Sequence, residues 1–210
     1  MLVIFDCDGV IADSETLSNQ MLCKALNSLG LALSLQETMD RFMGRSSQSC
    51  VQQIEQEIGR AVPADFWSDL QHMTFAQFDK HLKPVVGVPD LLASLAHPYC
   101  LASSGSHEKM QRTLGITGLK HHFQGRIFSA SDVKEGKPAP DLFLYAAGCM
   151  GFAAGDCVVI EDSMPGVQAA LKAGMLPLAY CGLSASAPFE AIHVTTFDSM
   201  ASLPQLLEQL

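Results

Sequence analysis

The stretch Leu2-Val3-Ile4-Phe5-Asp6-Cys7-Asp8-Gly9 decides the fold of this chain. Its apolar run is rich in β-branched and aromatic side chains and is soon followed by glycine, which predicts a buried strand that ends in a turn. Ligands of open α/β sheets bind at the carboxyl ends of such strands, so Asp6 and Asp8 lie where we expect chemistry. Two neighbouring carboxylates need a nearby cation, because otherwise one of them takes up a proton. A divalent metal is the simplest such cation.

The composition limits the classes of function. The chain has 210 residues, of which 48% are hydrophobic, so it can bury a core as one domain or as one domain with a sizeable insertion. Its net charge of −9 disfavours nucleic acid or an anionic membrane surface as a partner. No apolar run approaches the roughly 18 residues of a membrane span. We expect a monomeric, cytoplasmic protein in which any anionic substrate meets a local cationic pocket.

The cysteines and histidines show no pattern of a metal site. Seven cysteines are scattered along the chain without a CxxC spacing, and the seven histidines show no HExxH motif. A disulfide scaffold and a zinc site are therefore both disfavoured. Cys7 stands between the two acids as an alternative nucleophile, but no histidine lies near it in sequence, and small cysteines commonly fill cores.

The chain from Ser14 to Lys83 is predicted to be helical throughout. The first helix carries an apolar face that ends at Gly30, and Ser34-Leu35-Gln36-Glu37 has the spacing of a capping box that begins a second helix. A third helix is expected to end at Gly59, and a fourth covers residues 63–82.

After Pro84 the chain alternates between short apolar runs and helical segments, which predicts βαβ units and a parallel sheet. We therefore expect an α/β fold: a doubly wound parallel sheet with an inserted helical cap. The core domain comprises residues 1–13 and 84–210, and the cap comprises residues 14–83. A surface helix is expected between Asp198 and Leu210. The later strands are expected at Tyr99–Ala102, Arg126–Phe128, Cys157–Ile160 and Leu176–Tyr180.

Residues with phosphate or metal chemistry follow the ends of the predicted strands. Ser103 and Ser104 follow the second strand, and Glu161 and Asp162 follow the strand that ends at Ile160, while Lys137 precedes a proline that suits the start of a helix. In a parallel sheet these side chains converge on one edge.

This set of residues suffices for phosphoryl transfer through a covalent intermediate. Either Asp6 or Asp8 can attack phosphorus, which divides one difficult step into two easier ones. Mg²⁺ prefers oxygen ligands, so the two acids with Asp162 or Glu161 make a plausible site. Hydrogen bonds from Ser103 and the following turn, together with the Lys137 cation, suit the phosphate oxygens.

The motifs resemble the haloacid dehalogenase superfamily, specifically its β-phosphoglucomutase-like branch with a helical cap. The resemblance implies that Asp6 is the nucleophile and Asp8 the general acid and base. It also implies that Ser103 and Lys137 bind phosphate, and that Asp6, Asp162 and the Asp8 carbonyl bind Mg²⁺, with Glu161 assisting. The four motifs are Asp6-Cys7-Asp8-Gly9-Val10, Leu101-Ala102-Ser103-Ser104, Gly136-Lys137-Pro138-Ala139-Pro140-Asp141 and Glu161-Asp162-Ser163-Met164-Pro165-Gly166.

The resemblance also narrows the reaction. Superfamily members that cleave carbon–halogen or carbon–phosphorus bonds lack the acid at Asp8, whereas cleavage of a phosphate ester needs it to protonate the leaving oxygen. We expect a Mg²⁺-dependent phosphatase acting on a small phosphorylated metabolite, such as a sugar or sugar-acid phosphate. Gly44 and Arg45 in the cap are expected to select the substrate, although Arg45 also fits a solvated loop.

Two alternatives remain. A phosphosugar mutase would use the same Asp6, but Ser18 and Ser47 stand where β-phosphoglucomutases carry histidine and arginine, which disfavours it. A phospho-accepting signalling module of the response-regulator type also gathers acids, a hydroxyl, a lysine and Mg²⁺ on a parallel sheet. The helical cap and the order of the motifs speak against this module.

Overall fold

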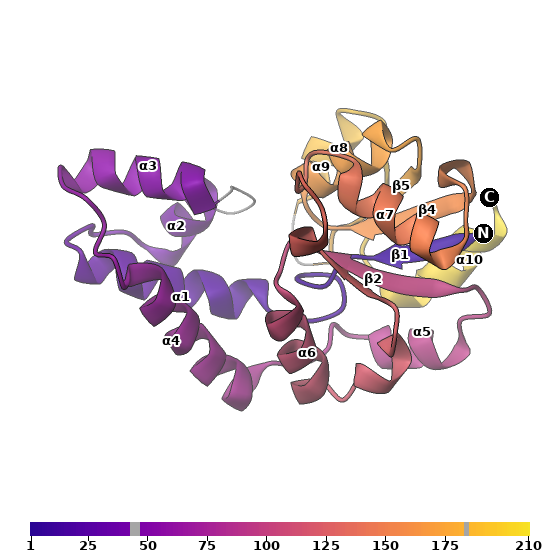
Figure 1. The fold of residues 1–210 in the computed structure, drawn as a ribbon, viewed down its shortest axis with the longest axis horizontal. Helices are drawn as coiled ribbons and strands as arrows, with labels where there is room; N and C mark the ends of the chain where they lie inside the picture. The colour runs from indigo at the N-terminus through magenta and orange to yellow at the C-terminus, as the bar shows by residue number, and fades with distance from the viewer. Residues whose placement is uncertain (43–46, 183–184) are drawn as a thin grey trace. The chain divides into compact units, whose positions relative to one another are not determined.

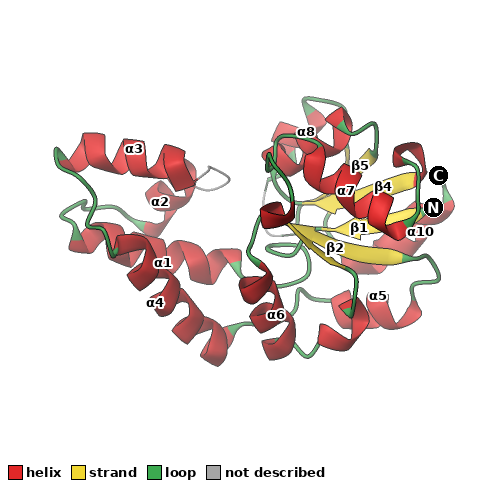
Figure 2. Ribbon diagram, in the orientation of Figure 1, coloured by secondary structure: helices red, strands yellow, loops and turns green. Residues whose placement is uncertain are grey.

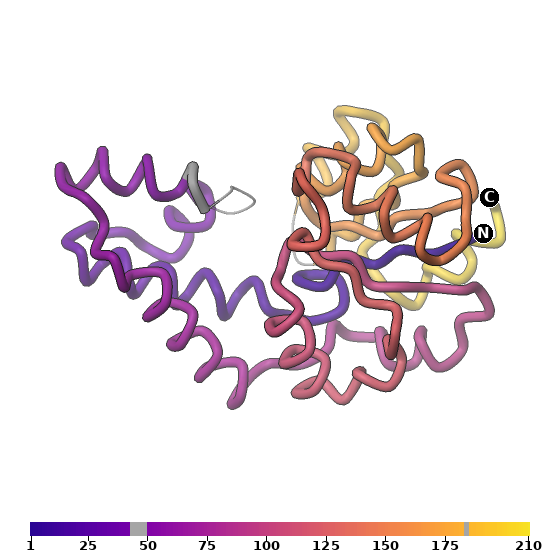
Figure 3. Tube along the Cα trace, viewed as in Figure 1, coloured from indigo at the N-terminus to yellow at the C-terminus, as the bar shows by residue number. Residues whose placement is uncertain are grey.

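The computed structural model describes residues 1–42, 47–182 and 185–210 (Figure 1). The chain divides into two compact units. The core unit consists of Met1–Asp13 and Lys83–Leu210, and the helical unit consists of Ser14–Leu82. Lys83 therefore belongs to the core unit, not to the helical insertion as the sequence suggested. The backbone N–H of Asp13 donates to the Lys83 carbonyl at 3.0 Å, so the chain leaves and re-enters the core unit through adjacent segments (Figure 3).

The core unit contains a parallel sheet whose strands lie in the order β3-β2-β1-β4-β5-β6. All four residues of the central β1 are buried, which explains its uninterrupted apolar sequence, since helices cover both faces of such a sheet. The strands are β1 (Leu2–Phe5), β2 (Tyr99–Ser103), β3 (Ile127–Ser129), β4 (Cys157–Glu161), β5 (Leu176–Tyr180) and β6 (Thr195–Phe197).

Helices pack on both faces of the sheet, so the predicted doubly wound α/β fold is confirmed (Figure 2). Alternate residues of β1 serve the two faces: Val3 and Phe5 pack with α5, α6 and α10, and Leu2 and Ile4 pack with α7 and α8. The helices are α5 (Val88–Ser94), α6 (His107–Ile116), α7 (Asp141–Met150), α8 (Met164–Lys172), α9 (Ala187–Glu190) and α10 (Leu203–Glu208). Short 3₁₀ turns cover Lys120–Phe123, Ala130–Asp132, Ala154–Asp156 and Met200–Ser202.

The helical unit has an apolar cluster of its own, to which each of the four helices described in this unit contributes. The predicted capping box is present: the Glu37 carboxylate accepts from the Ser34 backbone N–H at 2.8 Å, and the Ser34 hydroxyl accepts from the Glu37 N–H at 3.2 Å. The helices are α1 (Glu15–Ser28), α2 (Leu35–Phe42), α3 (Ser47–Ile58) and α4 (Phe66–His81). The predicted specificity residues Gly44 and Arg45 lie outside the described residues.

Candidate active site

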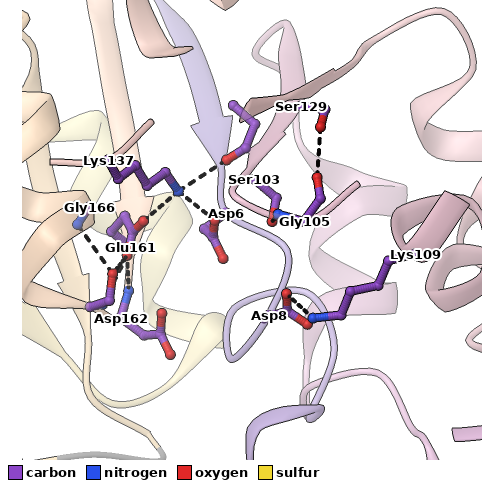
Figure 4. A network of polar contacts seen from close by, with 12 residues as sticks. Asp6, Asp8, Ser103, Gly105, Lys109, Ser129, Lys137, Glu161, Asp162 and Gly166 are labelled. Atoms are coloured by element: carbon purple, nitrogen blue, oxygen red, sulfur yellow. Dashed lines mark hydrogen bonds and ion pairs between the residues drawn. The ribbon is translucent and has the colours of Figure 1, made fainter. Parts of the chain in front are cut away.

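Four neighbouring strands deliver polar side chains to one edge of the core sheet (Figure 4). Asp6 directly follows β1, whereas Ser103, Ser129 and Glu161 are the last residues of β2, β3 and β4. Because the strands are parallel and in register, with Ser103 opposite Ser129, their carboxyl ends meet at the same edge. The sequence predicted that the residues with phosphate or metal chemistry converge on this edge.

Lys137 joins the ends of three strands. Its ammonium lies 2.5 Å from Asp6 Oδ1 and 2.6 Å from Glu161 Oε1, and it donates to the Ala102 carbonyl at 3.2 Å. The side chains of Lys137, Asp6 and Glu161 are at most 9% exposed. Burial lowers the pKa of Lys137, but the two carboxylates outweigh this effect, raise the pKa above its usual value and keep the ammonium charged.

The negative charge around Asp6 exceeds what Lys137 can neutralise. Burial raises the pKa of Asp6 to about 7; Lys137 opposes this rise, and the Glu161 and Asp8 charges add to it. One ammonium therefore faces two buried carboxylates, with a third charge nearby. Such an arrangement favours a further cation, because each additional positive charge stabilises the ionised form of Asp6.

Both carboxylate oxygens of Glu161 have hydrogen-bond partners within the core. Oε1 accepts from Lys137, and Oε2 accepts from the backbone N–H groups of Asp162 and Ser163 at 3.0 and 2.9 Å and from the Ser163 hydroxyl at 2.8 Å. A Cβ on Gly166 would lie only 1.7 Å from Glu161 Oε1, so the first turn of α8 fits around this carboxylate only with glycine there. Glu161 is thereby held to orient Lys137.

Asp162 lies against the loop that follows β1. The Gly9 backbone has a positive φ of 78°, and a Cβ at this position would lie 1.9 Å from Asp162 Oδ2. Only glycine combines this backbone conformation with so close an approach. Asp162 therefore extends from the end of β4 toward the loop that carries Asp6 and Asp8 (Figure 4).

The Asp8 side chain forms an ion pair with Lys109 on α6, with 2.7 Å between Asp8 Oδ2 and Lys109 Nζ. Figure 4 shows this pair apart from the contacts of Lys137. Burial lowers the pKa of Lys109, but the Asp8 carboxylate more than compensates and raises it above its usual value. The two acids of the first loop thus have different cationic partners, Lys137 for Asp6 and Lys109 for Asp8.

The turn after β2 is held from both sides. The buried Ser103 hydroxyl accepts from the Gly105 N–H at 3.1 Å, and the Ser129 hydroxyl donates to the Gly105 carbonyl at 2.8 Å. Ser104 lies between them and is exposed. The turn places the Ser103 hydroxyl close to Asp6 (Figure 4), and a hydroxyl donor suits the oxygens of a phosphate group.

Among the described residues, no three acidic, histidine or cysteine side chains are arranged to hold a metal ion as they stand. Their chemistry nevertheless fits Mg²⁺, which takes oxygen ligands and retains several waters. The excess negative charge at Asp6 and the position of Asp162 over the same loop support this fit. In contrast, the Glu161 oxygens are taken by Lys137 and donor groups, and the Asp8 carboxylate is taken by Lys109.

All seven cysteines are free thiols. Cys7 is buried, and burial, together with the Asp8 and Asp6 charges, raises the pKa of its thiol well above the usual value. A neutral thiol is a poor nucleophile, so Asp6 is the better candidate nucleophile of the two.

In the described part of the chain, no helix is long and apolar enough to cross a membrane.

A family model described as haloacid dehalogenase-like hydrolase matches residues 3–179. The chain belongs to this family. The 6-phosphogluconate phosphatase of Escherichia coli (strain K12) is 30% identical over 208 residues, which cover 97% of this chain and 93% of that protein. Membership in a hydrolase family confirms the expected resemblance and favours an enzyme over the signalling module.

Two solved structures show the same fold as this haloacid dehalogenase-like hydrolase. A haloacid dehalogenase-like protein of unknown function from Agrobacterium tumefaciens is 30% identical, with a TM-score of 0.89 over 99% of this chain and 97% of that chain. A haloacid dehalogenase family hydrolase from Deinococcus radiodurans, solved with bound phosphate and sodium, is 28% identical. Its TM-score is 0.81, and the match covers 99% of this chain and 95% of that chain.

Sequence reasoning missed two side chains at this site, Lys109 and Ser129. Ser129 was overlooked because the predicted third strand ended at Phe128, one residue too early. A signal for Lys109 was present in the sequence: it stands in the first turn of a helix that begins after Ser106, where the helix dipole disfavours a cation. A lysine in that position calls for an anionic partner.

Proposed function

We propose that this haloacid dehalogenase-like hydrolase is a Mg²⁺-dependent phosphatase. It hydrolyses a small sugar or sugar-acid phosphate through a phosphorylated Asp6, with Asp8 as general acid and base. The observation that carries the proposal is that the two aspartates of the first loop pair with two different lysines. Lys137 orients Asp6 at 2.5 Å, and Lys109 holds Asp8 separately at 2.7 Å, so the two carboxylates are prepared for different tasks.

In the first step an Asp6 oxygen attacks phosphorus, and the bond from phosphorus to the leaving oxygen breaks. The Asp8 carboxyl group gives its proton to that oxygen, which leaves as an alcohol. Lys137, Ser103 and the backbone donors of the turn after β2 balance the charge on the phosphoryl oxygens.

In the second step a water molecule attacks the phosphorus of the acyl phosphate. Its proton passes to Asp8, the bond between phosphorus and Asp6 breaks, and inorganic phosphate leaves. Asp6 is again a carboxylate, and Asp8 is again an acid, so the two steps form a closed cycle.

Mg²⁺ would be held by the carboxylates of Asp6 and Asp162 and the backbone carbonyl of Asp8. When bound, it supplies positive charge that offsets the repulsion between Asp6 and the substrate phosphate. The proposal is supported by the raised pKa of Asp6, which burial causes and the Glu161 and Asp8 charges increase, and by the phosphate and sodium bound in the Deinococcus relative.

The substrate class is supported by the Escherichia coli relative, a 6-phosphogluconate phosphatase that this chain matches over nearly its whole length. The test is a panel of phosphorylated sugars, polyols, sugar acids and nucleotides, assayed for phosphate release with and without Mg²⁺. We expect turnover on sugar or sugar-acid phosphates that requires the metal and is lost in Asp6→Asn. Retained activity in Asp6→Asn would contradict the mechanism.

A second assay distinguishes a phosphatase from a phosphosugar mutase. The protein is incubated with β-glucose 1-phosphate and a bisphosphate primer, and isomer formation is compared with phosphate release. Isomer formation that outpaces phosphate release would replace the phosphatase proposal with the mutase.

A further inference from the structure

Lys109 connects two loops that are far apart in sequence. It lies in the first turn of α6, and its ammonium reaches the Asp8 carboxylate at 2.7 Å across 101 positions of the chain. The Lys109 and Asp8 side chains are 27% and 24% exposed, so water surrounds this pair only in part. A half-buried ion pair of this geometry restrains both partners more than an exposed surface pair does.

The local sequence around Lys109 is arranged to hold its side chain in place. The Ser106 hydroxyl caps the helix by accepting from the Lys109 backbone N–H at 3.2 Å. A Cβ on Gly105 would lie 3.4 Å from Lys109 Cδ and 3.9 Å from Asp8 Oδ2, so the turn after β2 passes directly along the ion pair. The Ser129 hydroxyl holds this turn at the Gly105 carbonyl.

The position of Lys109 is unfavourable for a cation on local grounds alone. The amino end of a helix carries partial positive charge, which repels an ammonium in the first turn. Helix formation therefore does not account for lysine at this position. Its contact with Asp8 does, because the carboxylate compensates the repulsion and fixes the direction of the Lys109 side chain.

We propose that Lys109 is a positioning residue that orients the Asp8 carboxylate to accept the proton of the attacking water. This inference rests on the proposed function, because it takes Asp8 as the base in the second step. Lys109 itself neither gains nor loses a proton there. The water proton moves to Asp8, the water oxygen bonds to phosphorus, and the bond from phosphorus to Asp6 breaks. Without Lys109, the first step on an activated ester still proceeds, but hydrolysis of phosphorylated Asp6 slows.

The test separates the two steps with p-nitrophenyl phosphate, whose leaving group departs as an anion and needs no proton from Asp8. Rapid mixing of the enzyme and Mg²⁺ with this ester records the first release of p-nitrophenolate, which appears as a burst where the second step is the slower one, and then the steady rate. In Lys109→Met we expect a burst close to one equivalent per enzyme, followed by turnover slowed about tenfold or more. This loss is part of the roughly 10²–10⁴-fold that a general base contributes.

Three variants make the result specific. Lys109→Arg keeps the positive charge and is expected to recover part of the steady rate. Lys120→Met removes an exposed lysine of the core unit and serves as the matched control, with both phases as in the wild type. Asp8→Asn is expected to reproduce the burst and slow turnover of Lys109→Met, and Asp6→Asn is expected to lose the burst.

Equal losses of burst and steady rate in Lys109→Met, or no change in either, would overturn the positioning role, because a purely structural residue affects both phases alike. Failure of the proposed function looks different. In that case Asp8→Asn shows no burst, or Asp6→Asn retains one, whatever Lys109→Met does.

Discussion

Asp6, the proposed nucleophile, has an electrostatic cost to the fold. The pKa of Asp6 rises from 3.8 to about 7 because the side chain is buried, and Glu161 and Asp8 add to the effect. Between these two values the folded chain binds a proton at Asp6 that the unfolded chain has already lost. The unfolded state is therefore favoured as pH rises through this range.

We predict that, in the absence of metal, loss of the Asp6 proton lowers the free energy of unfolding as pH increases from 3.8 to about 7. The measurement is urea denaturation in EDTA at several pH values, for the wild type and Asp6→Asn. The wild type should lose stability relative to Asp6→Asn over this range, because the asparagine carries no such proton. A difference between the two proteins that does not change with pH would contradict the assigned cause.

The side chains of the site differ in how far their positions can be predicted from the sequence. Asp6, Ser103, Lys137 and Glu161 follow strands or precede a helix, so a parallel sheet already implies that they converge. Lys109 lies in a helix, and its partner is fixed by tertiary contact with Asp8. Such a contact depends on the direction of a long side chain, which the sequence pattern of α6 does not specify.

At the level of elements, the strands that read as apolar runs were predictable, and the edge strand β3 was predicted one residue short, whereas the other edge strand, β6, was not predicted. β1 and β4 are buried along their whole length and therefore read as apolar runs. β6 has three residues, Thr195–Phe197, of which only Phe197 is buried, so neither an apolar run nor an alternation marks it. The capping box of α2 was predictable because its partners, Ser34 and Glu37, are local.

Two helical glycines have opposite roles, which gives an element-scale prediction. Gly166 in α8 leaves room for the Glu161 carboxylate, whereas nothing lies within 4 Å of a Cβ on Gly148 in α7. We expect Gly166→Ala to destabilise the protein by about 1–3 kcal/mol through overpacking and to lower turnover. Gly148→Ala should stabilise it by roughly 0.5–1 kcal/mol, because alanine loses less backbone freedom on folding.

Urea denaturation of both variants, with phosphate release as the second measurement, checks this pair. Gly148→Ala is the control for adding a methyl group to a helix and should leave turnover unchanged. The account of Gly166 fails if both substitutions change stability in the same direction, or if Gly166→Ala keeps full turnover.

For the whole molecule, the sheet edge concentrates acidic groups in a chain whose net charge is already −9. A cation that binds the folded chain at this edge stabilises it by mass action, by about 2.7 kcal/mol at a hundred times its dissociation constant. We predict that Mg²⁺ raises the melting temperature of the wild type in differential scanning calorimetry. Asp162→Asn lacks a proposed ligand and should lose most of this shift, whereas an undiminished shift would place the metal elsewhere.

The strand order has a consequence for synthesis of the chain. β1 lies at the centre of the sheet, between β2 and β4, yet β4 begins only at Cys157. At about 5–20 residues per second on the ribosome, β1 waits roughly 8–30 s for that neighbour. Throughout this interval its apolar residues have an unpaired edge, which is where nascent chains associate wrongly. A stall before Cys157 therefore leaves the central strand available to chaperones or to other copies of the chain.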